Sequence, residues 1–410
     1  MILEPLDRAL LAGEHGAAAE RAMALLVRYG GACGAERFIS IESAHIDGCL
    51  YHGPSSIDFA RRFVDLGGKV RVPTTLNVAA VDVTHPGWHC GPPAVIAEQK
   101  KLTRLHERLG CLPTLTCAPY QRMVRPRRGE HVAWAESNAI VFINSVLGAR
   151  TDRYGDFTDL CAALTGRVPL AGLHRDEARR PAIIFDLPSV EAARLPRDLY
   201  FAAIGYVVGR RAPGIIPFLR GLPPGASEDE LKALGATGAS SGALALFHAE
   251  GVTPEAADMP TAGVPVEAVS PAELEAAIAS LCQAVEGEAV AAVCLGTPHY
   301  SIDEFALLNR AVDGRRRSAA TEIYVSTSRE IAAQVADNPA FDPLRAFGVH
   351  IVVDTCTYLA PVVRQTSGLI LTTSGKYAHY GPGNLGRRVA LMTLERCIRS
   401  AETGRVAAPC

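Results

Sequence analysis

The 410-residue chain has several absences, and each of them excludes a class of protein. Lys and Arg (41) do not outnumber Asp and Glu (43), so the chain has no basic field for a nucleic-acid backbone. No apolar run approaches the roughly 18 residues that a membrane span needs. The first residues show no basic stretch ahead of an apolar core, so we expect no signal peptide. We therefore expect a cytoplasmic protein without nucleic-acid or membrane partners.

Eleven cysteines are present, yet no two of them are spaced as C-x-x-C. This argues against a zinc ribbon, a thioredoxin-type site and a ferredoxin-type cluster loop. An odd number of thiols in a reducing compartment also argues against a disulfide framework. Most of these cysteines are expected to be small buried apolar residues, and any with a chemical role must be identified from its surroundings.

Motifs of common nucleotide and hydrolase sites are missing as well. The sequence contains no Walker A motif and no G-x-S-x-G nucleophile elbow. A Gly-rich stretch at 235–251 follows a helical pattern rather than a strand. We predict a tight turn between two helices there, in preference to an anion site at a helix N-terminus.

What is present is an alternation of short β-branched runs with helical patterns. Residues 18–30 and 55–68 have the apolar spacing of amphipathic helices. The runs that we interpret as strands followed by polar loops are 38–47, 111–120, 139–148, 181–188, 289–301, 321–330, 350–358 and 368–381. This order predicts βαβ units and an α/β fold with mainly parallel sheets. Ligands of such sheets gather at the carboxyl ends of the strands.

Two loop-rich stretches interrupt this alternation. Residues 210–230 are rich in Pro and Gly, and residues 254–273 form a second stretch of this kind. We therefore divide the chain into an N-terminal α/β region (1–210), a crossover and Gly-rich helical region (211–280) and a C-terminal α/β region (281–410).

Polar residues collect in the loops that end the strand-like runs. Helix capping and turns explain each loop by itself, but several of them in one chain favour a shared site. The candidates for acid–base and charge-stabilising roles are His45, Glu136 and Lys376. The candidates for substrate binding are Ser43, Thr75, Asn77, Ser137, Asn138, Asn144, Ser145, His299 and Ser374.

Two cysteines stand in similar settings. Cys117 lies in TCAPY and Cys356 in DTCTY, each near the end of a strand-like run. Thiolates from separate loops are preferred ligands of a metal cluster, whose iron can act as a Lewis acid on a substrate hydroxyl or carboxylate. The two thiols are therefore either arms of one metal site or ordinary packing residues.

At this point the chain resembles a known family. The segments SAHIDG, VPTTLN, TCAPY, AESNAIVFINSVLGARTDRYGD, GATGASSGA, GTPHYS, DTCTYLAP and TTSGKYAHYGPG are similar, in this order, to the large subunit of aconitase X in the aconitase superfamily. The resemblance implies an aconitase-like catalytic body of three α/β domains around an iron–sulfur cluster, lacking the swivelling domain. It implies a small swivelling-domain subunit as partner, which supplies a serine, and dehydration of a hydroxy acid.

The resemblance also implies cluster ligands. Cys117 and Cys356 match family cysteines that hold the cluster. Archaeal-type members read G-C-P-H where this chain reads GTPH, so Thr297 replaces a third cysteine. Cys294 is an alternative third ligand, although its odd offset along a strand turns it to the opposite face. The cluster type is left open between [2Fe-2S] and [3Fe-4S] or [4Fe-4S].

Known members are cis-3-hydroxy-L-proline dehydratases and phosphomevalonate dehydratases. The GTPH departure favours the first kind, a hydro-lyase of amino-acid catabolism that yields Δ1-pyrroline-2-carboxylate. One alternative is a phosphomevalonate dehydratase, in which Lys376, Arg150 and Arg329 would bind the phosphate. The other is a non-catalytic protein in which the thiols are structural.

Overall fold

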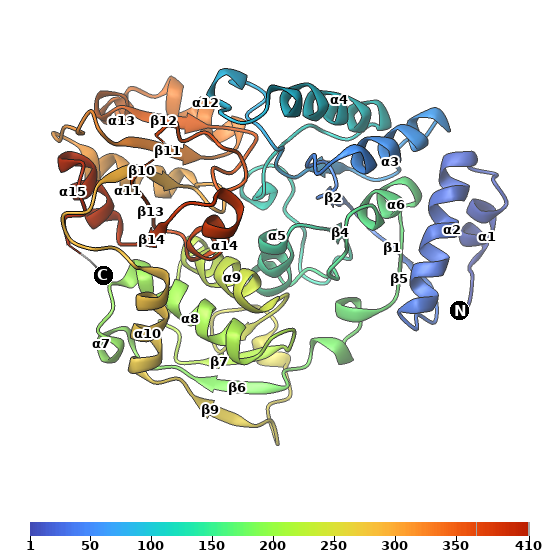
Figure 1. Ribbon diagram of the computed structural model, residues 1–410. Helices are drawn as coiled ribbons and strands as arrows, with labels where there is room; N and C mark the ends of the chain where they lie inside the picture. The colour runs from blue at the N-terminus through green and yellow to red at the C-terminus, as the bar shows by residue number, and fades with distance from the viewer. Residues whose placement is uncertain (366, 409–410) are drawn as a thin grey trace.

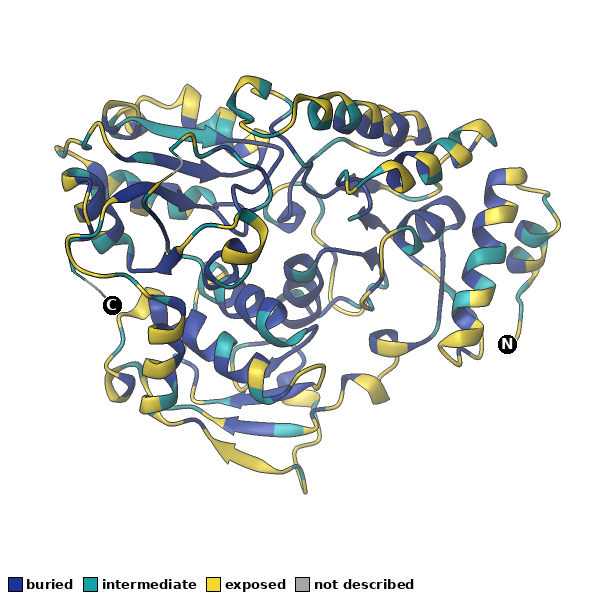
Figure 2. Ribbon diagram, viewed as in Figure 1, coloured by how far each residue is buried: buried dark blue, intermediate teal, exposed yellow. Residues whose placement is uncertain are grey.

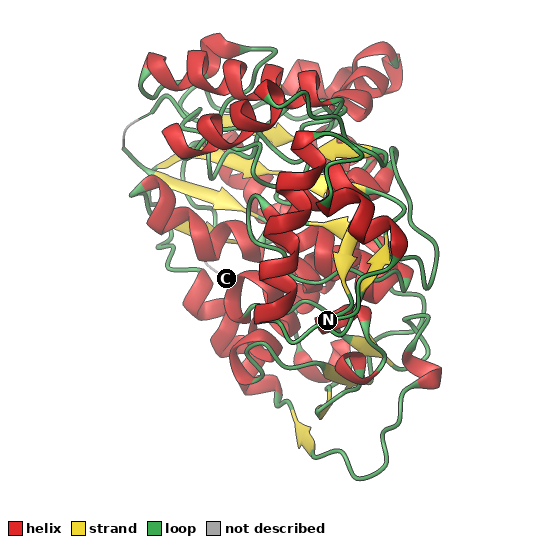
Figure 3. Ribbon diagram, turned by 90° about the vertical axis from the view of Figure 1, so that its right-hand side faces the viewer, coloured by secondary structure: helices red, strands yellow, loops and turns green. Residues whose placement is uncertain are grey.

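The computed structural model describes residues 1–365 and 367–408, and within them the strands form four sheets (Figure 1). Every pairing of named strands in these residues is parallel except that of β1 (Phe38–Ser40) with β5 (Arg167–Pro169). Helices flank the strands (Figure 3). The predicted α/β class with mainly parallel sheets is confirmed.

The N-terminal region is built on a small parallel sheet in the order β3-β2-β4. Its strands β2 (Ala44–Ile46), β3 (Thr74–Leu76) and β4 (Ala133–Trp134) are only two or three residues long, so the sheet depends on the helices that cover it. These helices are α1 (Pro5–Leu11), α2 (Ala17–Ala32), α3 (Pro54–Asp65), α4 (Pro93–Leu109), α5 (Ser137–Phe142) and α6 (Thr158–Thr165). Helices α2 and α3 confirm the two amphipathic patterns.

The middle region carries a four-stranded parallel sheet in the order β8-β7-β6-β9. Strand β9 is exposed at the edge of this sheet (Figure 2). Strands β6 and β7 pair although they lie on either side of the division that we expected near residue 210. The strands are β6 (Ile183–Asp186), β7 (Pro217–Arg220), β8 (His248–Ala249) and β9 (Val266–Ala268). The helices are α7 (Val190–Ala193), α8 (Arg197–Arg211), α9 (Glu228–Gly242) and α10 (Pro271–Leu281).

The C-terminal region contains a five-stranded parallel sheet in the order β12-β11-β10-β13-β14. Every residue of its central strand β10 is buried, which explains the continuous apolar run that encodes it. The strands are β10 (Val290–Leu295), β11 (Glu322–Ser326), β12 (Val349–Val352), β13 (Leu369–Thr372) and β14 (Val389–Leu391). The helices are α11 (Ile302–Val312), α12 (Arg329–Asp337), α13 (Asp342–Phe347), α14 (Gly375–Leu385) and α15 (Leu394–Thr403).

Three local predictions from the sequence are wrong. Residues 113–118, which contain Cys117, form no named strand. The preceding residue, Leu112, makes an isolated bridge to Thr75. Residues 139–148 form α5 and a π-helical turn (Ile143–Leu147), because a fully buried helix has the same apolar composition as a buried strand.

The Gly-rich stretch from residue 235 does not turn between helices but continues α9 to Gly242. Its glycines allow α9 to lie against α8, since a Cβ on Gly242 would fall 1.6 Å from the Gly209 carbonyl oxygen. Helix α9 in turn contacts α5 and α14, so the three regions meet at the centre of the molecule (Figure 1).

Candidate active site and metal centre

A cavity of about 150 Å³ lies where loops of the N-terminal and C-terminal regions converge. The loops that follow β2, β3, β10 and β12 contribute to it, together with the first turns of α5 and α14. Its polar lining comprises Asp47, Asn77, Cys117, Glu136, Ser137, Thr297, Cys356 and Lys376. Its apolar lining comprises Leu50, Val78, Pro298, Tyr358 and Leu359.

Three potential metal ligands meet beside this cavity. The Sγ atoms of Cys117 and Cys356 and a ring nitrogen of His299 lie within 4.8 Å of one another, and all three side chains are buried. The His299 backbone N–H also donates to Cys117 Sγ at 3.3 Å. The two thiols are therefore neighbours in space, as the sequence predicted.

The Cys117 side chain affects the protonation of Cys356. The pKa of the Cys356 thiol is raised well above its ordinary value by its hydrogen bond to Cys117 and by burial. Thiolates, not thiols, bind metals, so loading of this site must displace protons. Two thiols and an imidazole from separate segments have the donor chemistry of an iron–sulfur site.

The imidazole of His299 has both nitrogens engaged. Nδ1 lies 2.8 Å from Thr116 Oγ1, and Nε2 lies 3.2 Å from the Thr355 carbonyl oxygen. The tautomer that satisfies both contacts donates from Nε2 and accepts at Nδ1. Coordination through either nitrogen would replace one of these hydrogen bonds. Burial lowers the pKa of His299 to about 4, so the ring is neutral and suited to a ligand role.

Two further residues bear on the question of a third cluster ligand. We call Cys117, Cys356 and His299 the metal group. Cys294, on β10, does not belong to it, and its side chain forms hydrogen bonds with Tyr377 and Thr357 instead. The expected ligand role of Cys294 is thus corrected: alternate residues of a strand face opposite sides, and this thiol faces α14. Thr297, which replaces the family cysteine, lines the cavity, and its buried Oγ1 has no hydrogen-bond partner among the described residues.

A buried ion pair forms another wall of the cavity. Lys376 Nζ donates to Glu136 Oε1 at 2.5 Å and to Ser137 Oγ at 3.1 Å. Glu136 also caps α5, accepting the Ala139 N–H at 2.7 Å, and its backbone has a φ of 82°, in the left-handed region that non-glycine residues rarely adopt. Burial lowers the pKa of Lys376, but the negative charge of Glu136 outweighs it and holds that pKa well above its ordinary value. This lysine is therefore a permanent cation.

Several predicted residues lie in the small N-terminal sheet and do not line the cavity. His45 Nδ1 bonds to Thr75 Oγ1 at 2.8 Å, and its ring packs against Trp134. Ser43 Oγ accepts the Trp134 indole N–H at 3.1 Å. Burial lowers the pKa of His45 to about 3. These side chains stabilise the sheet from which the cavity loops emerge.

Other predicted residues position the site from outside. Asn138 Nδ2 donates to the Cys117 carbonyl at 3.2 Å and to Tyr120 Oη at 2.9 Å. Ser374 caps α14 and donates to the Thr297 carbonyl. Asn144 and Ser145 bond to the backbone of residues 245 and 247 and so connect the N-terminal and middle regions.

Asp354 was not predicted, yet it links two regions of the molecule. Its buried carboxylate accepts from Arg329 Nε at 2.5 Å and Nη2 at 2.8 Å, and from the backbone N–H groups of Val83 and Thr84 at 3.2 Å. Asp354 itself has a φ of 67°. It lies two residues before Cys356, so it fixes the approach of that thiol to the N-terminal region.

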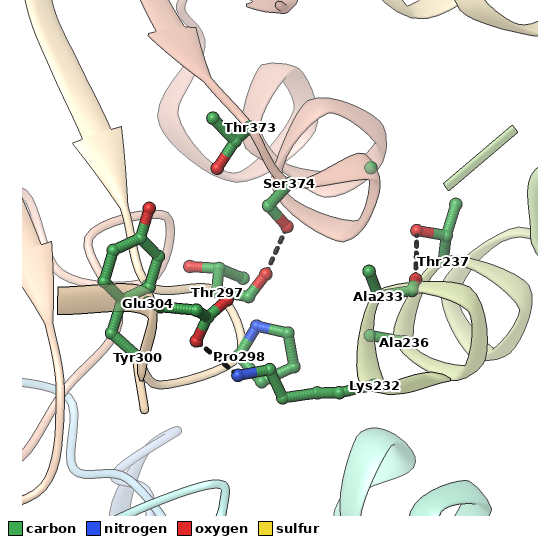
Figure 4. A pocket seen from close by; sticks show the side chains of 12 residues that line it. Lys232, Ala233, Ala236, Thr237, Thr297, Pro298, Tyr300, Glu304, Thr373 and Ser374 are labelled. Atoms are coloured by element: carbon green, nitrogen blue, oxygen red, sulfur yellow. Dashed lines mark hydrogen bonds and ion pairs between the residues drawn. The ribbon is translucent and has the colours of Figure 1, made fainter. Parts of the chain in front are cut away.

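Lys232 of α9 supports the loop that carries His299. Its ammonium pairs with Glu304 Oε2 at 2.5 Å and donates to the His299 carbonyl at 3.3 Å. Figure 4 shows this ion pair beside a small void of about 40 Å³, together with the bond from Ser374 to Thr297. The middle region thereby supports the loop that carries His299.

The N-terminal loop after β2 supplies Asp47, which the sequence placed in a polar loop but not among the site residues. Asn77 Nδ2 donates to its Oδ1. Burial, followed by the charges of Glu136 and Asp156, raises the pKa of Asp47 to about 7. A lone Asp after a strand is typical of a turn, so the sequence offered no signal for this role.

The helices that the structure describes include none with the length and apolarity needed to span a bilayer.

Family models match the chain in three consecutive parts. The first, second and third domains of aconitase X match residues 1–177, 181–279 and 290–403.

Named relatives fall into two groups. The chain is 42% identical to a cis-3-hydroxy-L-proline dehydratase of Pseudomonas aeruginosa, with 98% of this chain and 70% of the relative covered. It is 33% identical to a phosphomevalonate dehydratase large subunit of Thermococcus kodakarensis, with 98% of this chain and 100% of the relative covered. The crystal structure of Thermococcus kodakaraensis aconitase X in its holo-form matches with a TM-score of 0.88 at 31% identity, covering 98% of this chain and 100% of that chain.

Proposed function

Because the chain belongs to the aconitase X family, we propose that it is the large subunit of a dehydratase that removes water from cis-3-hydroxy-L-proline. One observation carries this proposal: a single cavity is lined by the two cysteines of a Cys-Cys-His group and by a carboxylate–ammonium pair. The Cys-Cys-His group offers a place for a metal cofactor near the leaving hydroxyl. The carboxylate–ammonium pair offers a fixed positive charge for the substrate carboxylate.

The charges of the cavity favour a hydroxy amino acid over a phosphate ester. Among the residues that line it, Lys376 is the one cation, and Glu136 already pairs with it. Arg150 pairs with Asp176 in another cleft, and Arg329 pairs with Asp354. Neither arginine that we considered for phosphate binding lines the cavity. A zwitterion of zero net charge is compatible with these surroundings, whereas a phosphate dianion lacks counter-charge.

We infer that Cys117, Cys356 and His299 hold an iron–sulfur cluster. When bound, such a cluster supplies a Lewis acid that stabilises the departing hydroxide. Thr297 lines the cavity at the position where the family resemblance implies a third cysteine, so this chain would offer a weaker donor there.

The protein's own groups would act on the other end of the substrate. The proton at C2 is only weakly acidic, and negative charge develops toward the carboxylate as it is removed. The Lys376 ammonium and the Ser137 hydroxyl can bind that carboxylate and stabilise this charge. Loss of the C3 hydroxyl then gives an enamine, which tautomerises to Δ1-pyrroline-2-carboxylate.

Glu136 holds Lys376 protonated and oriented, and as a carboxylate that lines the cavity it is a candidate to relay a proton to the substrate. We assign His45 no proton-transfer step, because it does not line the cavity. The small swivelling-domain subunit is the proposed source of the base at C2. The name of the Thermococcus relative as a large subunit supports such a partner.

The test is anaerobic purification of the chain with its small subunit, followed by assay of iron, sulfide, the visible spectrum and pyrroline formation. We expect a cluster and turnover in the wild type, and loss of both in Cys117→Ser and Cys356→Ser. Cys294→Ser is the matched control, since this buried thiol lies outside the metal group, and it should retain the cluster. A wild-type complex without iron, or with iron but no turnover of cis-3-hydroxy-L-proline, contradicts the proposal.

A further inference from the structure

Two carboxylates face the cavity, and they have different partners. Glu136 has a lysine at ion-pair distance. Asp47 has no Lys, Arg or His partner among the described residues, and its one side-chain partner is the amide of Asn77. Asp47 is partly buried. Withdrawing a carboxylate from water without a counter-ion is costly, and proteins retain such groups where a ligand supplies the missing charge.

A second unpaired acceptor lies beside it. Asn77 donates through Nδ2 to Asp47, and its Oδ1 is buried without any hydrogen-bond partner in the described residues. Both side chains line the cavity. The wall at the end of β2 and β3 therefore presents two adjacent oxygen acceptors to whatever enters, and a bound cation would favour the ionised form of Asp47.

This arrangement matches the chemistry of a secondary ammonium. Such a group carries one positive charge and two N–H donors, which equals the demand of one carboxylate and one amide oxygen. The other charged wall of the cavity, formed by Lys376 and Ser137, suits a carboxylate. An α-amino acid with its amine inside a ring presents both groups on neighbouring atoms.

We propose that Asp47 and Asn77 bind the ring ammonium of the substrate, and that Asp47 determines the preference of this enzyme for a cyclic amino acid over a hydroxy acid that lacks an ammonium group. This inference rests on the proposed function. The Asp47 backbone N–H donates to Asp159 Oδ2 at 2.7 Å, which holds the loop so that its side chain points into the cavity.

The experiment compares two inhibitors that differ in one ring atom. L-Proline carries the ammonium, and tetrahydro-2-furoate carries an ether oxygen in its place. We expect the complex with the small subunit to bind L-proline roughly 10- to 100-fold more tightly, the usual value of a charge-assisted hydrogen bond. In Asp47→Asn, which keeps the shape and an acceptor for Asn77, this preference should fall to within about threefold.

Asp156→Asn is the matched control. Asp156 is exposed and adds negative charge near Asp47 without lining the cavity, so its loss should leave the preference unchanged. If Asp47→Asn cannot be recovered folded, the wild type alone decides, because equal affinity for the two inhibitors overturns the inference.

The two failures are distinguishable. A wild type that turns over cis-3-hydroxy-L-proline but shows no ammonium preference, or an Asp47→Asn variant that keeps the preference, overturns the inference and leaves the proposed function intact. A wild type that contains its cluster but does not turn over this substrate removes both.

Discussion

The N-terminal and C-terminal regions each supply one cysteine to the metal group, but they position it in different ways. Cys356 follows β12 of a five-stranded parallel sheet, and the buried carboxylate of Asp354 fixes its loop. Cys117 lies in a segment without a named strand and is held by side-chain hydrogen bonds, including that of Asn138. A regular sheet thus positions one thiol, and a network of buried polar groups positions the other.

The largest predicted difference between the regions is in acid. Burial lowers the pKa of His45 to about 3, of His106 to about 4 and of His174 to about 3 in the N-terminal region, whereas among the described residues of the C-terminal region only His299 falls to about 4. Their pKa values in the unfolded chain are near 6.5, so between about pH 6.5 and 4 the unfolded state binds more protons. Stability is present above this window and is lost as the pH falls, by up to ~1.4 kcal/mol per histidine and pH unit.

Hydrogen exchange read by mass spectrometry at pH 7 and pH 5, with correction for the intrinsic rate, measures this difference. Peptides from residues 38–76 should lose protection at pH 5 before peptides from residues 302–326, which contain no histidine. Replacement of the exposed His15 by Gln should leave the result unchanged. Equal loss of protection in the two sets of peptides would contradict a special acid sensitivity of the N-terminal region.

The next largest effect should come from breaking the support of the Cys356 loop. Asp354→Ala removes the partner of Arg329 and of two backbone N–H groups, and we expect a loss of about 2–4 kcal/mol. Arg329→Gln should cost less, because this side chain is partly exposed and Asp354 keeps its backbone donors. Urea unfolding measures the stability, and bound iron per chain measures the position of Cys356. Unchanged stability in Asp354→Ala would show that the sheet alone positions this loop.

A smaller effect is expected when the support of Cys117 is broken. Asn138→Ala leaves the Cys117 carbonyl and Tyr120 Oη without this donor, which should cost about 1–2 kcal/mol. We expect a greater loss of iron per kcal/mol than in Asp354→Ala, because no strand compensates here. The alkylation rate of Cys117 in the metal-free protein, read by peptide mass spectrometry, is the second measurement. A variant with wild-type iron and alkylation would argue against a positioning role.

The smallest effect concerns the hydrogen bond between Thr116 of the N-terminal region and His299 of the C-terminal region. Thr116→Val deletes the hydroxyl that contacts His299 Nδ1 at 2.8 Å and should cost about 1 kcal/mol. If His299 binds the metal through Nε2, the visible spectrum should also shift, because the other nitrogen has lost its hydrogen bond. His106→Gln is a control, since this buried histidine bonds only to its own helix. An unchanged spectrum would point to a cluster held without this imidazole.

The two regions also differed in how well the sequence described them. Four of the five strands of the C-terminal sheet, β10 to β13, were recognised because uninterrupted β-branched residues followed by a cap are typical of buried parallel strands, whereas β14 was missed. In the N-terminal region, residues 139–148 had the same apolar character but form α5 and a π-helical turn. Cys117 was interpreted as the end of a strand, although its segment contains none.

The candidate site was partly predictable for the same physical reasons. Cys117 and Cys356 were paired because each follows a strand-like run, and they do meet. His299 was predicted to bind the substrate rather than the metal. Alternation of side-chain direction along a strand could not place this residue, because the chain leaves β10 at Gly296, where φ is 83°. Asp47 was noted as a polar loop residue but not chosen for the site, and Asp354 was not considered, because their importance depends on partners far away in the sequence.

The dependence of the metal group on both ends of the chain has a consequence for its biosynthesis. Roughly 240 residues separate the two thiols, and at about 5–20 residues per second a ribosome needs tens of seconds to add them. The Cys117 thiol is therefore made long before Cys356 and Asp354 can complete its surroundings. Iron delivered before Cys356 has been made would meet only one of the two thiols, so we expect the site to be loaded only after the last sheet has been synthesised and folded.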